Sequence, residues 1–520
     1  MAVVKDFVWK ETTPGVWQRD ADEVEEFYSA LIRSYAGSGR MEFAITGHVS
    51  LTVPVTDESA STTAARLDEA VRSAWLWLRH DNPTIASRAY FDQALGRWQK
   101  RYEELSDETA RAAWGSQTLQ KVSNGQTGIE WANSDPPAPK VATLFVVEPL
   151  SADSPSVDSE SVIRRDLVLR SPHDIIDGIG TLQLFSNLIA HISRVFVGGA
   201  AHASLPLLDG SETARLSPPY RAAADVPETP TPAQQARLDA MQNAQDSSVA
   251  DNSAVDIGIP FRQRATVPGK HKRVSRTISP VRTAQLLAAL KPRKTTVTHA
   301  FHAAIATVVR DIHFEQSSET ERAAEKKVRY TNYILRNERA QCLPPYNTPK
   351  HAAAVYHSVS GGRLEITLSS SVAASRDAQI EEFANVLASM REYYLSVRDD
   401  KDHYALAPYI MAGLTPDVPG SEDVVVPVPA PNPRPSVSLS SMGVVDGIIV
   451  PDRQGGIRVD NPWVTGEELG NGLGLFLGTF RGELCLSAAY NEAWHGREEV
   501  EGFLERCERV VFAWVESVSL

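Results

Sequence analysis

The chain has 520 residues, of which 42 % are hydrophobic and 8 % aromatic, so it can fill substantial cores and does not have the composition of a disordered protein. Its formal net charge is −13 at pH 7 and no run rich in Lys or Arg stands out, which argues against a nucleic-acid-binding surface. The three cysteines, Cys342, Cys485 and Cys507, are too far apart in sequence to predict a disulfide framework or a CxxC zinc site.

Neither a targeting segment nor a membrane span is predicted. Residues 1–10 mix Lys5, Asp6 and Lys10 with short apolar pieces and lack the apolar core of a signal peptide. No hydrophobic stretch reaches the length that crosses a bilayer. The expected compartment is therefore the cytoplasm; we separately expect a monomer whose partners are small molecules.

The first part of the chain alternates predicted strands and helices. Runs of alternating or continuous apolar residues between turn signals predict strands at 43–54, 141–149 and 167–170. Apolar residues at helical spacing predict helices at 63–80, 86–105 and 179–196.

A change in composition follows this part of the chain. Residues 198–272 are rich in Pro, Ala, Ser and Asp, with Thr-Pro-Thr-Pro at 229–232. We interpret this segment as a crossover linker that contains one short helix at 233–245. The linker divides the chain into an N-terminal lobe, residues 1–197, and a C-terminal lobe, residues 273–520.

The second lobe again mixes both kinds of element. Two glycines, Gly361 and Gly362, predict a hairpin between the strands 355–360 and 364–369. The other predicted elements are strands at 273–278, 328–335, 473–480 and 483–490, and helices at 281–290, 297–312, 378–397 and 497–518.

The segment 166–178 carries the most informative chemistry. An apolar strand ended by Pro172 places His173 at the mouth of a sheet, and Asp177 and Gly178 open the next helix. A histidine with an ordinary pKa near ~6.5 is mostly unprotonated at neutral pH and can accept a proton from a hydroxyl. From the residues alone, the pattern favours a structural histidine beside an N-cap aspartate over a catalytic one.

Other familiar sites are not predicted. His299 and His302 stand three apart on one predicted helix, but no third metal ligand follows nearby, so no metal site is expected. The chain has no dinucleotide fingerprint, no P-loop and no GxSxG elbow, and therefore no bound nucleotide cofactor or serine nucleophile is expected.

Residues 171–178 resemble the HxxxDG signature shared by the BAHD acyltransferases, the condensation domains of nonribosomal peptide synthetases and the fungal trichothecene O-acetyltransferases. Three further stretches, 296–304, 435–443 and 484–493, resemble the last group and occur in the same order. The resemblance extends from about Phe43 to the C-terminus. It implies an α/β (α+β) fold of two chloramphenicol-acetyltransferase-like lobes, each a mixed sheet with helices, joined by the long crossover linker.

The resemblance also implies a function and a site. It implies a CoA-dependent O-acyltransferase that moves an acetyl group from acyl-CoA, a co-substrate rather than a bound cofactor, to a hydroxyl of a secondary metabolite. In such an enzyme His173 is the general base in a solvent channel between the lobes, while Asp177 points away from the substrate and holds the loop through an ion pair. Four residues on strands near this channel are further candidate substrate contacts: Ser440, Ser441, Tyr490 and Asn491.

Two departures from the related families bear on the reaction. Condensation domains carry a second histidine where this chain has Pro172, which argues against peptide-bond formation, and the plant enzymes' DFGWG motif has no counterpart here. Two other functions stay open. One is a condensation-domain-like cyclase or another CoA-free enzyme of secondary metabolism that uses the same channel, and the other is a non-catalytic, carrier-protein-binding relative.

Overall fold

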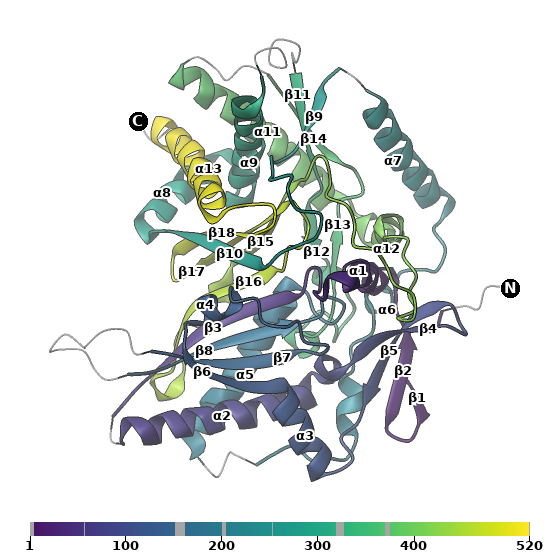
Figure 1. Cartoon of the computed structure of the whole chain (residues 1–520), viewed down its shortest axis with the longest axis vertical. Helices are drawn as coiled ribbons and strands as arrows, with labels where there is room; N and C mark the ends of the chain where they lie inside the picture. Colours follow the sequence, from purple (N-terminus) through teal and green to yellow (C-terminus); the bar gives the residue numbers. More distant parts are fainter. Residues whose placement is uncertain are drawn as a thin grey trace.

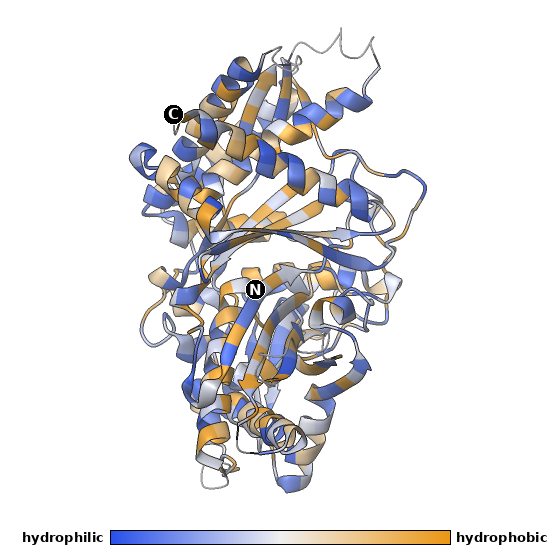
Figure 2. Cartoon of the chain, turned by 90° about the vertical axis from the view of Figure 1, so that its left-hand side faces the viewer, coloured by the Kyte–Doolittle hydropathy of each residue, from blue (hydrophilic) through white to orange (hydrophobic). Residues whose placement is uncertain are grey.

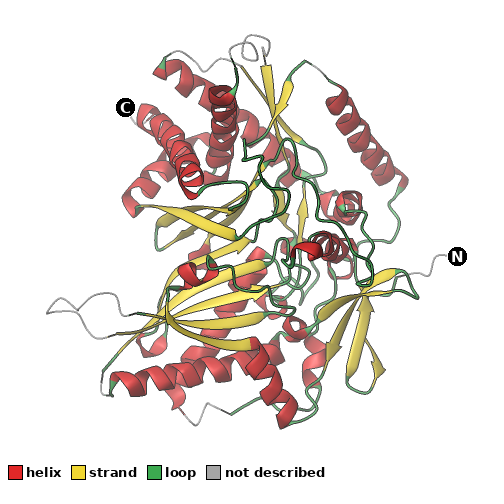
Figure 3. Ribbon diagram, in the orientation of Figure 1, coloured by secondary structure: helices red, strands yellow, loops and turns green. Residues whose placement is uncertain are grey.

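The computed structural model describes residues 5–56, 58–150, 162–199, 204–251, 253–318, 327–369 and 375–518. Two lobes are stacked along the long axis of the molecule, each with a mixed sheet, helices on its outer side and loops between the lobes (Figures 1 and 3). Among the described residues no helix is both long and apolar enough to cross a membrane. The predicted fold class is confirmed.

The first lobe is built on a five-stranded sheet of order β16-β3-β8-β7-β6. Helices α2 and α5 pack on each other and bury one face of this sheet, where Trp75 and Phe185 lie in the core. The elements are β3 (Ile45–Pro54), α2 (Ala60–Asp81), α3 (Glu108–Thr118), β6 (Leu119–Gly125), α4 (Gly128–Ala132), β7 (Thr143–Pro149), β8 (Val162–Ser171), α5 (Gly178–Gly198) and β16 (Arg458–Gly466).

A small antiparallel sheet of order β1-β2-β5-β4 stands beside the first lobe (Figure 1). Its strands are β1 (Lys10–Thr13), β2 (Val16–Asp20), β4 (Arg88–Asp92) and β5 (Arg97–Glu103), and α1 (Glu23–Ser34) follows β2. The helix predicted at 86–105 is therefore wrong. The aspartate Asp92 accepts hydrogen bonds from Ala94 N and Leu95 N, and Gly96 has φ 64°, so the chain turns back as a hairpin.

The second lobe contains a four-stranded sheet of order β10-β18-β17-β15 and a three-stranded sheet of order β14-β11-β9. Helices α9, α11 and α13 pack together on the outer side, and hydrophobic and hydrophilic residues alternate along the strands (Figure 2). The elements are β9 (Val255–Ile257), β10 (His271–Ile278), α8 (Pro280–Leu290), α9 (Val297–Gln316), β11 (Lys327–Asn332), β14 (Leu364–Ser369), α11 (Arg376–Asp399), β15 (Val437–Val444), β17 (Leu473–Phe480), β18 (Glu483–Asn491) and α13 (Arg497–Val518).

The hairpin predicted between 355–360 and 364–369 is wrong. Strand β14 pairs with β11, whereas β13 (His357–Val359) pairs with β12 (Leu335–Asn337) between the lobes. The two glycines separate two sheets because the side chains of the two segments enter different cores: Leu364 lies in that of the second lobe, and Tyr356 packs with α1 and α12 (His403–Leu414).

The chain crosses between the lobes more often than a single linker implies. Strand β16 lies in the segment assigned to the second lobe, yet it pairs antiparallel with β3 of the first sheet. The predicted linker contains α6 (Tyr220–Ala223), β9 and a longer helix than expected, α7 (Pro232–Ala250), which a capping box of Thr231 and Gln234 opens. The predicted lobe boundaries stay predictions.

Candidate active site

The loop of His173 connects the central strand β8 to helix α5. Strand β8 pairs with β3 on one side and β7 on the other and ends at Ser171, and α5 begins at Gly178 with Asp177 as its N-cap. The side-chain carboxylate of Asp177 accepts a hydrogen bond from Gly180 N at 2.7 Å. This short connection places His173 two residues beyond the end of β8 and five residues before the start of α5.

Two aromatic side chains surround the imidazole of His173. The ring of Tyr28, from α1, stacks on it with centroids 3.7 Å apart and planes 10° apart. The Tyr28 hydroxyl is joined to His357 Nε2 by a hydrogen bond of 2.8 Å, and the His357 ring lies 5.7 Å from that of His173. Only 9 % of His173 is exposed, and its Nδ1 is enclosed without a hydrogen-bond partner.

Burial makes the imidazole of His173 a weaker base than the sequence predicts. Desolvation, and then the nearby His357, lower its pKa to about 3. The ring is therefore neutral over the whole physiological range. The expectation of an ordinary pKa for His173 is corrected. The imidazole is still neutral at pH 7, as expected, because pH 7 lies further above the lowered pKa.

The carboxylate of Asp177 faces groups on the interlobe segment 337–356. Its Oδ2 accepts hydrogen bonds from Arg339 Nη1 at 2.8 Å and from Tyr356 N at 2.9 Å. Burial by itself raises the pKa of Asp177, but the Arg339 guanidinium more than offsets this and holds the pKa below its usual value. Asp177 thus ties the start of α5 to this segment through a buried ion pair.

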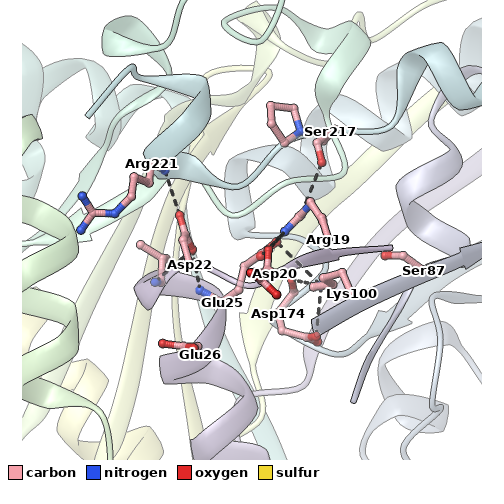
Figure 4. A network of polar contacts seen from close by, with 12 residues as sticks. Arg19, Asp20, Asp22, Glu25, Glu26, Ser87, Lys100, Asp174, Ser217 and Arg221 are labelled. Atoms are coloured by element: carbon pink, nitrogen blue, oxygen red, sulfur yellow. Dashed lines mark hydrogen bonds and ion pairs between the residues drawn. The ribbon is translucent and has the colours of Figure 1, made fainter. Parts of the chain in front are cut away.

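A second buried network holds the residue next to His173 (Figure 4). Lys100 of β5 is completely buried and donates a hydrogen bond to the carbonyl oxygen of Asp174. Its Nζ lies 3.1 Å from Asp174 Oδ2 and 3.9 Å from Glu25 Oε1, and Glu25 also binds Arg19 through two hydrogen bonds of 2.6 and 2.8 Å. The small sheet and α1 therefore support the loop from behind.

The four further candidates lie on two strands of the second lobe. Ser440 lies on β15, and Ser441 beside it accepts a hydrogen bond from Thr298 Oγ1 at 3.0 Å. Tyr490, on β18, packs in the core of the second lobe. Both ends of the Asn491 amide bind the backbone of Gly269, with distances of 2.7 and 3.0 Å.

Of the two strands that carry these four residues, β15 approaches the start of α5 after the loop of His173. A Cβ added at Gly178 meets the Met442 side chain at 3.0 Å, so the strand of Ser440 and Ser441 reaches the start of α5. Asn491 instead fixes a loop of its own lobe. These four residues stay predictions as substrate contacts.

The linings of five cavities in the described part of the chain do not include His173. None of these five is the predicted channel with His173 at its middle, and the ring of Tyr28 covers one face of the imidazole. Solvent reaches the imidazole only at the small part of its surface that stays exposed.

Two places in the described structure have side chains of the kinds that bind metals: His302, and the group of His80, Asp209 and Glu212. His302 is occupied at both nitrogens by the hydroxyls of Tyr394 and Tyr330, at 2.9 and 3.0 Å. One other described group, His80, Asp209 and Glu212, brings its ligand atoms within 4.8 Å of one another. The guanidinium of Arg215 lies 3.3 Å from His80 Nδ1, and this positive charge opposes a bound cation.

Sequence reasoning missed the groups that hold His173 in place. Tyr28, Lys100, Arg339 and His357 lie far from the motif in sequence and belong to different elements. No short-range sequence pattern indicates these residues, because each of them comes near the loop of His173 only in the folded chain. The weak signal that was available is His357, a lone histidine directly after the apolar run 352–356.

Comparison with known proteins supports the same fold. No model of a known protein family matches the chain. It is 25 % identical over 97 % of its length to the O-acetyltransferase pigM of Monascus ruber, of which it covers 86 %, and 23 % identical to the acetyltransferase pigO of the same fungus, with 97 % of each chain covered.

Solved structures resemble the chain over almost its whole length. A trichothecene 15-O-acetyltransferase from Fusarium sporotrichioides matches with a TM-score of 0.78 at 15 % identity and 99 % coverage of both chains. The first condensation domain of the calcium-dependent antibiotic synthetase matches with a TM-score of 0.58 at 14 % identity and 96 % coverage of both. The predicted resemblance and the two-lobed architecture are confirmed.

Proposed function

We propose that the chain is an acyltransferase with the condensation-domain-like fold. It transfers an acetyl group from acetyl-CoA to a hydroxyl of a secondary metabolite, with His173 as the general base. One observation carries the proposal: a neutral imidazole stands at the end of β8, in the HxxxDG position, in a chain that aligns over 97 % of its length with fungal acetyltransferases.

The Nε2 atom of His173 is the proton acceptor in this mechanism, because Nδ1 is enclosed. It takes the proton of the acceptor hydroxyl as that oxygen bonds to the thioester carbonyl carbon. The C–S bond then breaks, and the imidazolium returns the proton to the leaving thiolate. A pKa of about 3 makes the imidazolium a strong acid, which favours this return and requires proton transfer to accompany bond formation.

No covalent acyl-enzyme is needed, since both substrates occupy the site together and their alignment supplies much of the rate. Asp177 acts on the loop through Arg339 rather than on the proton. Acyl-CoA is a co-substrate, and no bound cofactor takes part. We expect the enzyme to act as a cytoplasmic monomer on a small-molecule alcohol, and gel filtration with light scattering tests the oligomeric state.

A second candidate is a CoA-free reaction such as cyclisation. It is favoured by the fold, which also matches the cyclization-docking bidomain of a peptide synthetase with a TM-score of 0.54 and an epimerization domain with 0.56. In this reaction His173 polarises a single substrate. Product formation without CoA separates it from acyl transfer.

The test measures free thiol from acetyl-CoA in the presence of a metabolite extract. We expect thiol release that needs both the extract and His173, and a loss of about 10²- to 10⁴-fold in His173→Ala. His313→Ala, on α9 of the second lobe, is the matched control and keeps the rate. An unchanged rate in His173→Ala overturns the mechanism.

A further inference from the structure

A cavity of about 660 Å³ lies between the start of β10 and the start of α13. Asn133, which follows α4 of the first lobe, lines it together with residues of the segments 262–274 and 490–497. Its size falls within the range of small-molecule sites, roughly 300–1,000 Å³. We call it the basic cavity, because four of its lining residues are positively charged: Arg262, Lys272, Arg273 and Arg497.

The guanidinium of Arg273 is buried without a counter-ion. Only 5 % of Arg273 is exposed, and among the described residues its side chain has no carboxylate partner and one hydrogen bond, from Nη2 to Cys485 Sγ at 3.8 Å. The Nε atom is enclosed without a partner, whereas Nη1 is neither hydrogen-bonded nor enclosed. Since Arg273 lines the basic cavity, Nη1 is the nitrogen that a ligand there can reach.

Other buried arginines show what Arg273 lacks. Arg19, Arg310 and Arg339 are also buried, and each pairs with a carboxylate, at 2.6, 2.8 and 2.8 Å. Burial lowers the pKa of Arg273, and Cys485 offsets this only in part. Because a buried charge without a partner is costly, an anion in the cavity would stabilise this guanidinium.

Neighbouring side chains hold Arg273 in place. Its Cζ lies 4.3 Å from the ring centroid of Trp463 on β16, and Trp463 stacks on His48 with ring centroids 5.1 Å apart. Both ends of the Asn133 amide bind the backbone of Arg273, with distances of 2.7 and 2.9 Å. The arginine is therefore positioned before a ligand arrives, which lowers the entropic cost of binding.

The other charges around the basic cavity are also mainly positive. Lys272 Nζ donates to the Asn133 carbonyl oxygen at 2.5 Å and lies 3.9 Å from Glu492 Oε2. Glu492 is the one carboxylate that lines the cavity. Arg262 and Arg497 are more exposed, and each pairs with a glutamate of α13. The four cations thus create a field that attracts an anion toward Arg273.

We propose that the basic cavity binds a phosphate group, which accepts a hydrogen bond from Arg273 Nη1. Phosphate oxygens form strong, charge-assisted hydrogen bonds with a guanidinium, and the double negative charge of a phosphate gains more from the surrounding cations than a carboxylate does. This chemistry fits two sources: a phosphate of acetyl-CoA, or a free phosphate or pyrophosphate ion. The first source rests on the proposed function, whereas phosphate binding by itself does not.

The probe is inorganic pyrophosphate, titrated into the full chain at low salt by calorimetry. We expect Arg273→Met to weaken its binding at least about tenfold, because a charge-assisted hydrogen bond is lost. Glu492→Gln removes a repelling charge and should tighten binding about threefold. Pyrophosphate that fails to bind, or that binds Arg273→Met as tightly as the parent, overturns the proposal.

Two further variants make this test specific to the basic cavity. Lys272→Met should weaken pyrophosphate binding about threefold. Because the Lys272 side chain is 24 % exposed, this variant keeps the test decisive if Arg273→Met does not fold. Arg509→Met removes the same charge from a separate cavity between α9 and α13, and as the matched control it leaves binding within about twofold of the parent. Equal weakening by Lys272→Met and Arg509→Met overturns the proposal.

Competition between pyrophosphate and CoA identifies the source of the phosphate. If the phosphate belongs to CoA, CoA displaces pyrophosphate, and Arg273→Met weakens CoA binding at least about tenfold. If the site takes a free ion, CoA and pyrophosphate bind together, and CoA binds Arg273→Met as it binds the parent. The thiol-release assay is independent of this test. Pyrophosphate binding that depends on Arg273 in a chain without acyl transfer counts against the proposed reaction alone.

Discussion

The substitution Asp177→Asn tests how the loop of His173 is held. In the parent, Asp177 Oδ2 accepts from Arg339 Nη1 and Tyr356 N. An asparagine can still cap α5 through its oxygen, but its NH₂ group then faces two donors, and the Arg339 charge is left buried without a partner. Breaking a buried ion pair in this way costs about 3–5 kcal/mol.

Urea unfolding measures this cost. With a slope on the order of 3 kcal/mol per M, we expect the midpoint of Asp177→Asn to fall by at least about 1 M. Adding Arg339→Met removes the unpaired charge, so the double variant should recover at least about 1 kcal/mol relative to the sum of the two single changes.

An exposed ion pair provides the control. Arg376 and Glu516 are 3.0 Å apart with side chains 68 % and 66 % exposed. Arg376→Met should therefore cost less than about 1 kcal/mol. A midpoint for Asp177→Asn equal to that of Arg376→Met would refute the role of the buried pair.

Four other outcomes follow from the same contacts. Tyr28→Phe keeps the ring stacked on His173 and should retain activity within about threefold, while Tyr28→Leu should lower kcat about tenfold or more with little change in KM; equal kcat values in stopped assays would contradict this. Lys100→Met leaves the buried carboxylate of Asp174 without its cation, while Glu25 keeps Arg19, and should destabilise the chain by about 3–5 kcal/mol in urea unfolding. Folding raises the pKa of Glu468 to about 7, so the stability of the folded chain should fall as pH rises from about 4.5 to 7. Glu468→Gln should flatten this dependence of stability on pH. The pH profile of kcat/KM should show no acid limb near 6.5, since the pKa of His173 is about 3; such a limb would show an ordinary imidazole.

The prediction of secondary structure failed where two periodicities competed. Residues 88–103 contain apolar side chains that suit a helix, but the turn at Asp92 and Gly96 makes a hairpin. Trp98, Lys100 and Tyr102 share one face of the strand β5. Elements with a long, one-sided pattern, such as α2, α5 and α13, were predicted almost to their ends, because one apolar face is enough to specify them.

The residues of the site also divide into those that the sequence predicted and those that it could not predict. The motif and its resemblance located His173, Asp177 and the start of α5, all of which depend on contacts within a few residues. The partners of these residues could not be found from sequence: Arg339 is 162 positions from Asp177.

By itself, the sequence determined an acidic chain of alternating strands and helices, and a histidine and an aspartate at a strand-to-helix turn. Only the tertiary structure decided that β16 crosses into the first sheet, that Tyr28 covers the imidazole and that Arg339 pairs with Asp177. The physical reason is the separation along the sequence over which each kind of interaction acts. Turn and capping preferences act over a few neighbouring residues, whereas burial, which sets each of these contacts and shifts the pKa values of His173 and Glu468, depends on segments hundreds of residues apart.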